Sequence, residues 1–244
     1  MLATKLQKIW ISTKIVCSTL QTSLLLLCLS LINKCSRSKV DAKVHKWAAK
    51  LLHIVDADYQ VFNPHNVVFL PQQLYVIMSN HRSHFDIPLI FAAFPNGSIR
   101  MIAKSELFKV PVWGRAMKKS EFFSITRDNA KQAKQDLQLA QEKMLSGLIP
   151  WIAPEGTRSF DRKLQRFKKG GFMLALETGA TIIPVAICGS EKILPAKTLD
   201  FGVGEKVIIG IAEPIVTTEY NIKNIRQLVT LTEERINNII NQLE

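Results

Sequence analysis

The sequence predicts an α/β protein with a central, mostly parallel sheet flanked by helices, preceded by N-terminal helices that anchor it to a membrane. From residue 60 onward, short apolar runs alternate with helical patterns, and polar motifs follow two of the apolar runs. An uncharged stretch over residues 15–32 predicts the anchor. A chain of 244 residues with 47% hydrophobic content is long enough for one such domain and a short appendage.

Residues 1–38 form the expected anchor. The uncharged stretch 15–32 is strongly apolar only over 24–32, which is shorter than the roughly 20 residues that a membrane span needs. Basic residues lie on both sides of it, so an anchor on one membrane surface is favoured over a crossing. A cleaved signal peptide is disfavoured, because no small-x-small site follows the apolar run and charges stand in its place.

Residues 39–58 predict a basic amphipathic helix. Apolar side chains, among them Val40, Val44, Trp47 and Leu51, recur at helical spacing, and lysines lie mostly between them. Such a helix either lies on a membrane surface or packs its apolar stripe on the domain, and both arrangements are compatible with each other.

Residues 59–244 form the expected α/β domain. Buried strands are predicted over 74–79, 99–103, 122–125, 148–152, 182–187 and 206–211. Helices are predicted over 87–94, 130–145, 171–178 and 225–242. The helix over 130–145 has a polar face that should meet solvent.

Charge and cysteine usage limit the chemistry. The formal net charge of +12 favours anionic partners, either nucleic acid, an anionic bilayer or a phosphorylated substrate. Residues 1–50 carry nine Lys or Arg against one acidic residue, so much of this charge lies beside the expected anchor. The four cysteines show no CxxC spacing and the five histidines no HExxH, which predicts a reducing compartment and no metal site.

The first candidate motif, SNHRSHFD over residues 79–86, follows the expected first strand. A histidine such as His81 can take a proton from an alcohol near neutral pH. Asp86, five residues on, can reach back to hold one imidazole nitrogen and stabilise the imidazolium. Ser83 suits a helix N-cap better than a nucleophile. His84 would need a third ligand of matching spacing to form a metal site with His81, and none is present.

The second candidate motif, PEGTRS over residues 154–159, follows the apolar run LIPWIA. The planar fork of Arg158 suits a phosphate, and backbone N–H groups around Gly156 can support one. Both motifs come at strand ends, where open α/β sheets place reacting groups.

These motifs, together with basic stretches around Lys104 and Arg127, resemble the glycerolipid acyltransferase superfamily, which includes bacterial lysophosphatidic acid acyltransferases. The family has four ordered blocks: NHxxxxD, GxxFIxR, a PEGTRS-type segment and an apolar stretch with proline. The resemblance covers residues 40 to 215 and matches two blocks in full. It implies the fold of the glycerolphosphate acyltransferases.

The resemblance also implies residue roles. His81 becomes the general base and Asp86 its orienting partner. The acceptor's phosphate is assigned to Lys104, Arg127, Glu155, Gly156, Thr157 and Arg158. The second block departs from the pattern, because Glu121 stands where glycine is usual and Ser124 where an apolar residue is usual. The acceptor is therefore less firmly implied than the reaction, and the apolar stretch around Pro184 is expected to shape the site.

The activity implied is transfer of a fatty acyl chain from an acyl carrier protein or coenzyme A thioester to lysophosphatidic acid, which forms phosphatidic acid. No metal or other cofactor is implied. The expected location is a phospholipid membrane, with the active site on the cytoplasmic side of a bacterial inner membrane. Alternatives are another lysophospholipid or glycerol 3-phosphate as acceptor, or a non-catalytic membrane-binding protein. The sequence has no GxSxG elbow and no GxxxxGK loop, and we expect no nucleic-acid partner.

Overall fold

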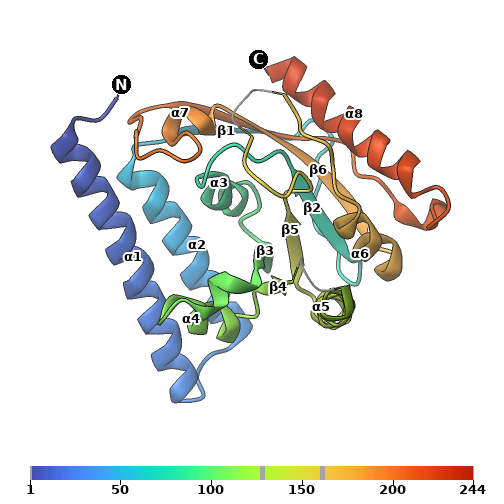
Figure 1. Cartoon of the computed structure of the whole chain (residues 1–244), viewed down its shortest axis with the longest axis horizontal. Helices are drawn as coiled ribbons and strands as arrows, with labels where there is room; N and C mark the ends of the chain where they lie inside the picture. Colours follow the sequence, from blue (N-terminus) through green and yellow to red (C-terminus); the bar gives the residue numbers. More distant parts are fainter. Residues whose placement is uncertain (1, 127–129, 160–162, 244) are drawn as a thin grey trace.

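The computed structural model describes residues 2–126, 130–159 and 163–243, and a seven-stranded sheet lies at its centre (Figure 1). The strand order is β1-β7-β6-β2-β5-β3-β4. The strands are β1 (Asp58–Phe62), β2 (Tyr75–Ser79), β3 (Ile99–Lys104), β4 (Phe123–Ile125), β5 (Ile149–Ile152), β6 (Thr181–Cys188) and β7 (Lys206–Ile211). Strands β6 and β7 pair antiparallel, and the other described pairings of this sheet are parallel. The prediction of a mostly parallel sheet flanked by helices is confirmed.

Helices cover both faces of the sheet. Successive residues of a strand point to opposite faces, so the apolar strands present side chains for burial on both. In β2, Ile77 joins one hydrophobic core, whereas Val76 and Met78 join the other. The first core is covered by α2 (Arg37–Ile54), α3 (Asp86–Ala93) and α4 (Trp113–Lys119). The second is covered by α5 (Ala130–Leu145), α6 (Gly170–Thr178) and α8 (Ile225–Leu243).

Helix α1 (Lys5–Leu31) is far longer than the apolar run of residues 24–32. It begins with a capping box formed by Thr4 and Gln7. Its polar residues do not interrupt it, since hydroxyls such as those of Thr19 and Ser23 donate to carbonyls one turn earlier in the same helix. With a mean hydropathy of 1.6 over its apolar window, α1 is long and apolar enough to cross a membrane by length and composition.

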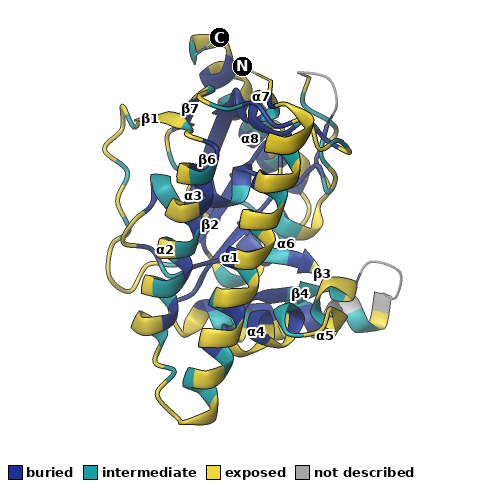
Figure 2. Cartoon of the chain, turned by 90° about the vertical axis from the view of Figure 1, so that its left-hand side faces the viewer, coloured by how far each residue is buried: buried dark blue, intermediate teal, exposed yellow. Residues whose placement is uncertain are grey.

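Helices α1 and α2 lie side by side, and α1 also contacts α4 (Figure 1). The apolar stripe of α2 is buried against the domain, and Trp47 on α2 donates a hydrogen bond of 3.1 Å to Thr19 on α1. Of the two arrangements considered for this helix, the structure therefore shows packing on the domain. The exposed apolar surface belongs to α1, most of whose length is solvent-facing in Figure 2.

A buried ion pair fastens α2 to the sheet. The guanidinium of Arg100 on β3 is fully buried, and its Nη1 lies 2.7 Å from Oδ1 of Asp41 on α2. Burial lowers the pKa of Arg100, and the charge of Asp41 opposes this shift. Asp41 also accepts a hydrogen bond of 2.6 Å from Ser98, so both of its oxygens hold the helix in place.

Several short elements have no counterpart among the predicted ones. Strand β1 is exposed along its whole length, so it lacks the apolar signal of a buried strand. Helix α4 and the single turn α7 (Ser190–Ile193) are too short to show a clear helical period. Two 3₁₀ segments, η1 (Ser105–Lys109) and η2 (Thr217–Glu219), complete the described elements.

Candidate active site

The candidate site lies where three neighbouring strands end. Strands β2, β5 and β3 are consecutive in the sheet and parallel, so their carboxyl ends meet at one edge. Strand β2 is followed by His81, β5 by residues 154–158, and β3 ends at Lys104. The topology therefore brings together motifs that lie far apart in the sequence.

His81 and Asp86 form a direct pair. Nδ1 of His81 lies 2.7 Å from Oδ2 of Asp86, and the carboxyl side chain is completely buried. Oδ2 also accepts the backbone N–H groups of Arg82 at 2.8 Å and Ser83 at 3.0 Å. Because Nδ1 is held by Asp86, the other ring nitrogen of His81 is the one available to a substrate proton.

The ring of His81 is also fixed by its neighbours. Trp151 on β5 meets it edge to face, with ring centroids 5.7 Å apart. The indole N–H of Trp151 donates to Ser79 at 2.9 Å, which fixes the Trp ring in turn. Asn80 ties the end of β2 to β6 through two hydrogen bonds with the backbone of Ile187. His81 is thus held at the rigid edge of the sheet.

The two motifs are bonded to each other through Glu155. Its buried carboxylate accepts the backbone N–H of His81 at 2.8 Å and that of Gln165 at 2.9 Å. The carbonyl of His81 accepts the N–H of Ser159 at 2.9 Å. Burial raises the pKa of Glu155, and these backbone hydrogen bonds act in the opposite direction. Glu155 therefore holds the second motif against the first.

A cavity of about 580 Å³ opens above these strand ends. Its lining includes five of the eight predicted site residues: His81, Lys104, Gly156, Thr157 and Arg158. Asp86 and Glu155 lie behind the lining, and Arg127 lies outside the described residues. The chemical roles assigned to these residues stay predictions.

Lys197 and Trp151 also line the cavity, although the motifs did not point to them. Lys197 comes from the loop after α7 and adopts a left-handed backbone with φ of +61°. No sequence pattern links that loop to the two motifs. Trp151 lies inside the apolar run LIPWIA, where its apolar character resembles that of any core residue.

His84 lies at the cavity wall, where its pKa is lowered to about 4. The main cause is desolvation by partial burial, and the second is the positive charge of Arg158. Its imidazole is therefore neutral at neutral pH. Among residues 2–126, 130–159 and 163–243, no group of three metal-ligating side chains comes together.

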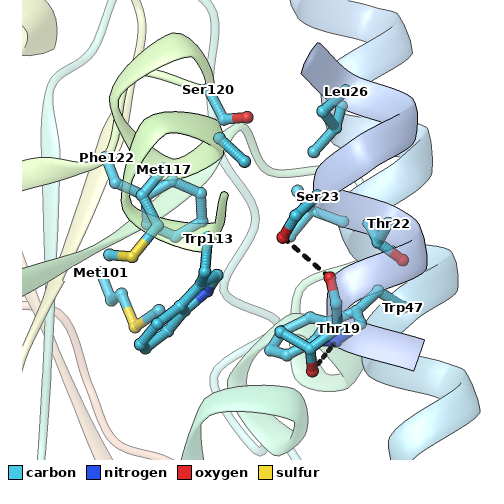
Figure 3. Close-up of a pocket in the computed structure, with 12 residues that line it drawn as sticks. Thr19, Thr22, Ser23, Leu26, Trp47, Met101, Trp113, Met117, Ser120 and Phe122 are labelled. Atoms are coloured by element: carbon cyan, nitrogen blue, oxygen red, sulfur yellow. Dashed lines mark hydrogen bonds between the residues drawn. The ribbon is translucent and has the colours of Figure 1, made fainter. Parts of the chain in front are cut away.

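A second, narrow space lies behind the cavity, between α1, α2 and α4 (Figure 3). Its walls are mostly apolar, with Trp113, Met117 and Phe122 on one side and Leu26 of α1 on the other. Met101 lines both this space and the cavity, so its thioether side chain separates the two.

Comparison with known proteins agrees with this geometry. A family model described as Acyltransferase matches residues 61–188. A 1-acyl-sn-glycerol-3-phosphate acyltransferase of Haemophilus influenzae is 27% identical over 198 residues, which cover 79% of this chain and 80% of that protein. The crystal structure of PlsC, the 1-acyl-sn-glycerophosphate acyltransferase from Thermotoga maritima, superposes with a TM-score of 0.81 at 26% identity, covering 98% of this chain and 95% of that one.

Relatives with longer chains match over a shorter part. The chloroplastic 1-acyl-sn-glycerol-3-phosphate acyltransferase LPAT1 of Arabidopsis thaliana is 33% identical over 120 residues, which cover 49% of this chain. The chain spans about a third of the length of the chloroplast relatives that it matches, 33% of one and 34% of another.

Proposed function

Because the chain belongs to the acyltransferase family, we propose that it transfers a fatty acyl chain from a thioester to the free hydroxyl of lysophosphatidic acid, forming phosphatidic acid. The family model covers more than half of the chain, from residue 61 to residue 188. The observation that carries the proposal is the His81–Asp86 pair, because its His81 lines a cavity together with Lys104 and Arg158.

The proposed chemistry is a direct attack without an acyl-enzyme. The free ring nitrogen of His81 takes the proton of the acceptor hydroxyl while its oxygen forms a bond to the thioester carbonyl carbon. The C–S bond then breaks, and the imidazolium returns the proton to the departing thiolate. Asp86 stabilises the imidazolium, and its backbone donors keep it in place. The thioester is already activated, so these steps use no metal or other cofactor.

Positioning of the acceptor falls to the cations of the cavity. Arg158 presents a planar fork to the phosphate, Lys104 adds a second charge, and the segment of Gly156 and Thr157 borders the same space. Arg127 is assigned to the same phosphate by its place in the second block. Holding the phosphate brings the hydroxyl to His81, which turns binding energy into positioning. Glu155 supports this pocket from behind rather than by touching the ligand.

The setting is a phospholipid membrane. The exposed apolar surface of α1, within the anchor predicted over residues 1–38, is suited to the bilayer, and basic residues beside it suit anionic headgroups. We place the active site on the cytoplasmic side of a bacterial inner membrane, where an acyl carrier protein or coenzyme A supplies the thioester.

A matrix of acceptors and donors tests the proposal. The protein in detergent is offered lysophosphatidic acid, lysophosphatidylcholine or glycerol 3-phosphate, each with coenzyme A and carrier-protein thioesters. We expect transfer to lysophosphatidic acid above the others. The His81→Ala variant should bind lysophosphatidic acid but show no turnover. Preferred transfer to another acceptor, or wild-type activity in His81→Ala, would contradict the assignment.

A further inference from the structure

An apolar groove of about 290 Å³ borders the candidate site, apart from the space of Figure 3. Helix α1 forms one wall, α3 the floor, and the loop after α7 the other wall. The side chains that line it are mainly apolar, among them Ile15, Val16, Pro88, Leu194, Leu199 and Phe201. The groove therefore suits a hydrocarbon rather than a charged group.

The inner end of the groove meets the catalytic loop. His84 lines both the groove and the cavity that holds His81. Phe85, next to the Asp86 carboxylate in sequence, lies in the groove wall. Ser83 donates a hydrogen bond of 2.8 Å to the carbonyl of Leu194, which joins the catalytic loop to the far wall. The inner end of an acyl chain bound in the groove would thus lie beside the His81–Asp86 motif.

The outer end opens onto the exposed apolar face of α1. Val16 is 55% exposed and Leu199 is 65% exposed, so both rims of the groove are accessible. Ile9 and Leu20 lie on the same side of α1 as Val16 by helical spacing, and both are exposed. The groove therefore continues into the surface that we assign to the bilayer.

This arrangement matches a ligand with one anionic head, one hydroxyl and one hydrocarbon chain. Cations line the cavity at the inner end, and apolar side chains line the groove at the outer end. An apolar cavity of roughly 150 Å³ can hold a benzene molecule, so the groove has room for about twice that volume of hydrocarbon. The rest of a long chain would lie along α1 toward the bilayer.

We propose that this groove holds the acyl chain of the lysophospholipid acceptor. The proposal rests on the proposed function and extends it by naming a site for the acceptor's chain. A reaction between two acyl-bearing molecules needs two apolar surfaces that meet at the base. The groove is one such surface, and it borders the cavity that holds His81.

Filling the groove tests the proposal through chain-length dependence. Each buried methylene contributes roughly a fourfold factor in affinity, so loss of a few methylene contacts is measurable. Val16→Trp and Leu199→Trp place a large ring at exposed rim positions that should tolerate it. We expect each to raise KM for palmitoyl lysophosphatidic acid about tenfold or more, and to leave KM for the hexanoyl analogue and for the donor nearly unchanged.

Leu25→Trp is the matched control, because Leu25 is exposed on the opposite side of α1 from Val16 by helical spacing and does not line the groove. It should leave all three KM values near those of wild type. Equal effects of Val16→Trp on both acceptors, or no effect on either, would overturn the proposal.

Photolabelling locates the chain without turnover. The His81→Ala variant is irradiated with lysophosphatidic acid that carries a diazirine near the end of its acyl chain, and labelled peptides are mapped. We expect labels at residues 12–16 and 199–201. Labels confined to the lining of Figure 3 would overturn the proposal even where transfer occurs. Labels in the groove of a protein that acylates no acceptor would instead keep the lipid site and refute the proposed function.

Discussion

Glu121, at the entrance to β4, accepts two hydrogen bonds from Arg37 on α2, at 3.0 Å from Nη2 and 3.2 Å from Nε. This bidentate pair holds a residue whose backbone has a φ of +63°. A left-handed backbone costs a residue with a Cβ roughly 1–2 kcal/mol, which is why glycine suits this place. The departure from the usual second block is therefore accompanied by a contact that compensates for it.

The first prediction compares two replacements of Glu121. Glu121→Ala loses the pair and keeps the strain, so we expect it to lower the free energy of unfolding by about 1 kcal/mol. The two side chains are 32% and 38% exposed, which limits the pair to this range. Glu121→Gly loses the pair but relieves the strain and should be less destabilising. Denaturant unfolding measures both, and an equal or larger loss in the glycine variant would refute the strain.

Much of the fold follows from the sequence because the central strands are buried on both faces. Their apolar runs mark strands such as β2, β3 and β6 to within one residue of the observed ends. Strand β1 offers no such run because all of its residues are exposed. Helix α1 extends well beyond the apolar run of residues 24–32 because its Ser and Thr hydroxyls bond within the helix instead of ending it.

The candidate site, like the fold, could be predicted from the sequence only in part. His81 and the segment 154–158 could be found because each motif is local and follows a strand directly. Lys197 could not, since only the tertiary packing of its loop brings it to the cavity. Glu155 holds the two motifs together through contacts between two distant segments, and no spacing rule reveals such contacts.

The second prediction concerns the buried pair that fastens α2. Asp41→Ala would leave the Arg100 guanidinium buried without its partner, so we expect a loss of about 3–5 kcal/mol in the free energy of unfolding. Combining Asp41→Leu with Arg100→Met should recover much of this loss, because no uncompensated charge remains. Asp200→Ala is the control, since it breaks an exposed pair with Lys8 and should cost at most about 1 kcal/mol. Additive losses in the double variant would contradict this account.

The third prediction is a pH dependence of stability at His84. Its pKa falls from an ordinary 6.5 to about 4 in the folded state. Between these pH values the unfolded chain binds a proton at His84 that the folded chain does not. Protonation therefore favours the unfolded state, and the free energy of unfolding falls as pH falls from 6.5 toward 4. His84→Asn removes the titrating group. As pH falls from 6.5 to 4, the Tm of wild type should therefore fall more than the Tm of this variant. The effect should be modest, because the ring is partly exposed. A constant difference would refute the shift.

The fourth prediction addresses the donor chain. The space of Figure 3 has a volume of only about 40 Å³, but Met101→Ala would open it to the larger cavity. The preference for longer acyl donors, measured as the ratio of kcat/KM for stearoyl and lauroyl thioesters, should therefore rise. The truncation should also cost about 2–5 kcal/mol of stability. Met78→Ala is the control, because Met78 is buried in the other core. It should lose comparable stability without a change in donor preference, and a matching change there would exclude Met101 as the boundary.

The last prediction tests Arg158 as the phosphate ligand. Arg158→Lys keeps the charge but loses the fork, so the KM for lysophosphatidic acid should rise. Arg158→Ala should cost more, on the order of 2–5 kcal/mol in acceptor binding if the phosphate is desolvated in the cavity. The KM for the donor should change little in either variant, and Arg166→Ala, which removes an exposed arginine outside the cavity lining, should change neither value.

A monoacylglycerol, which lacks the phosphate, makes the comparison decisive. Wild type should use it poorly, and the Arg158 variants should use it no worse than wild type does, because the lost contact is one that this acceptor never makes. If Arg158 instead supports the loop of residues 154–159, both acceptors will suffer equally and Tm will fall together with activity. That outcome would leave Lys104 and Arg127 to hold the phosphate and would weaken the case for lysophosphatidic acid over other acceptors.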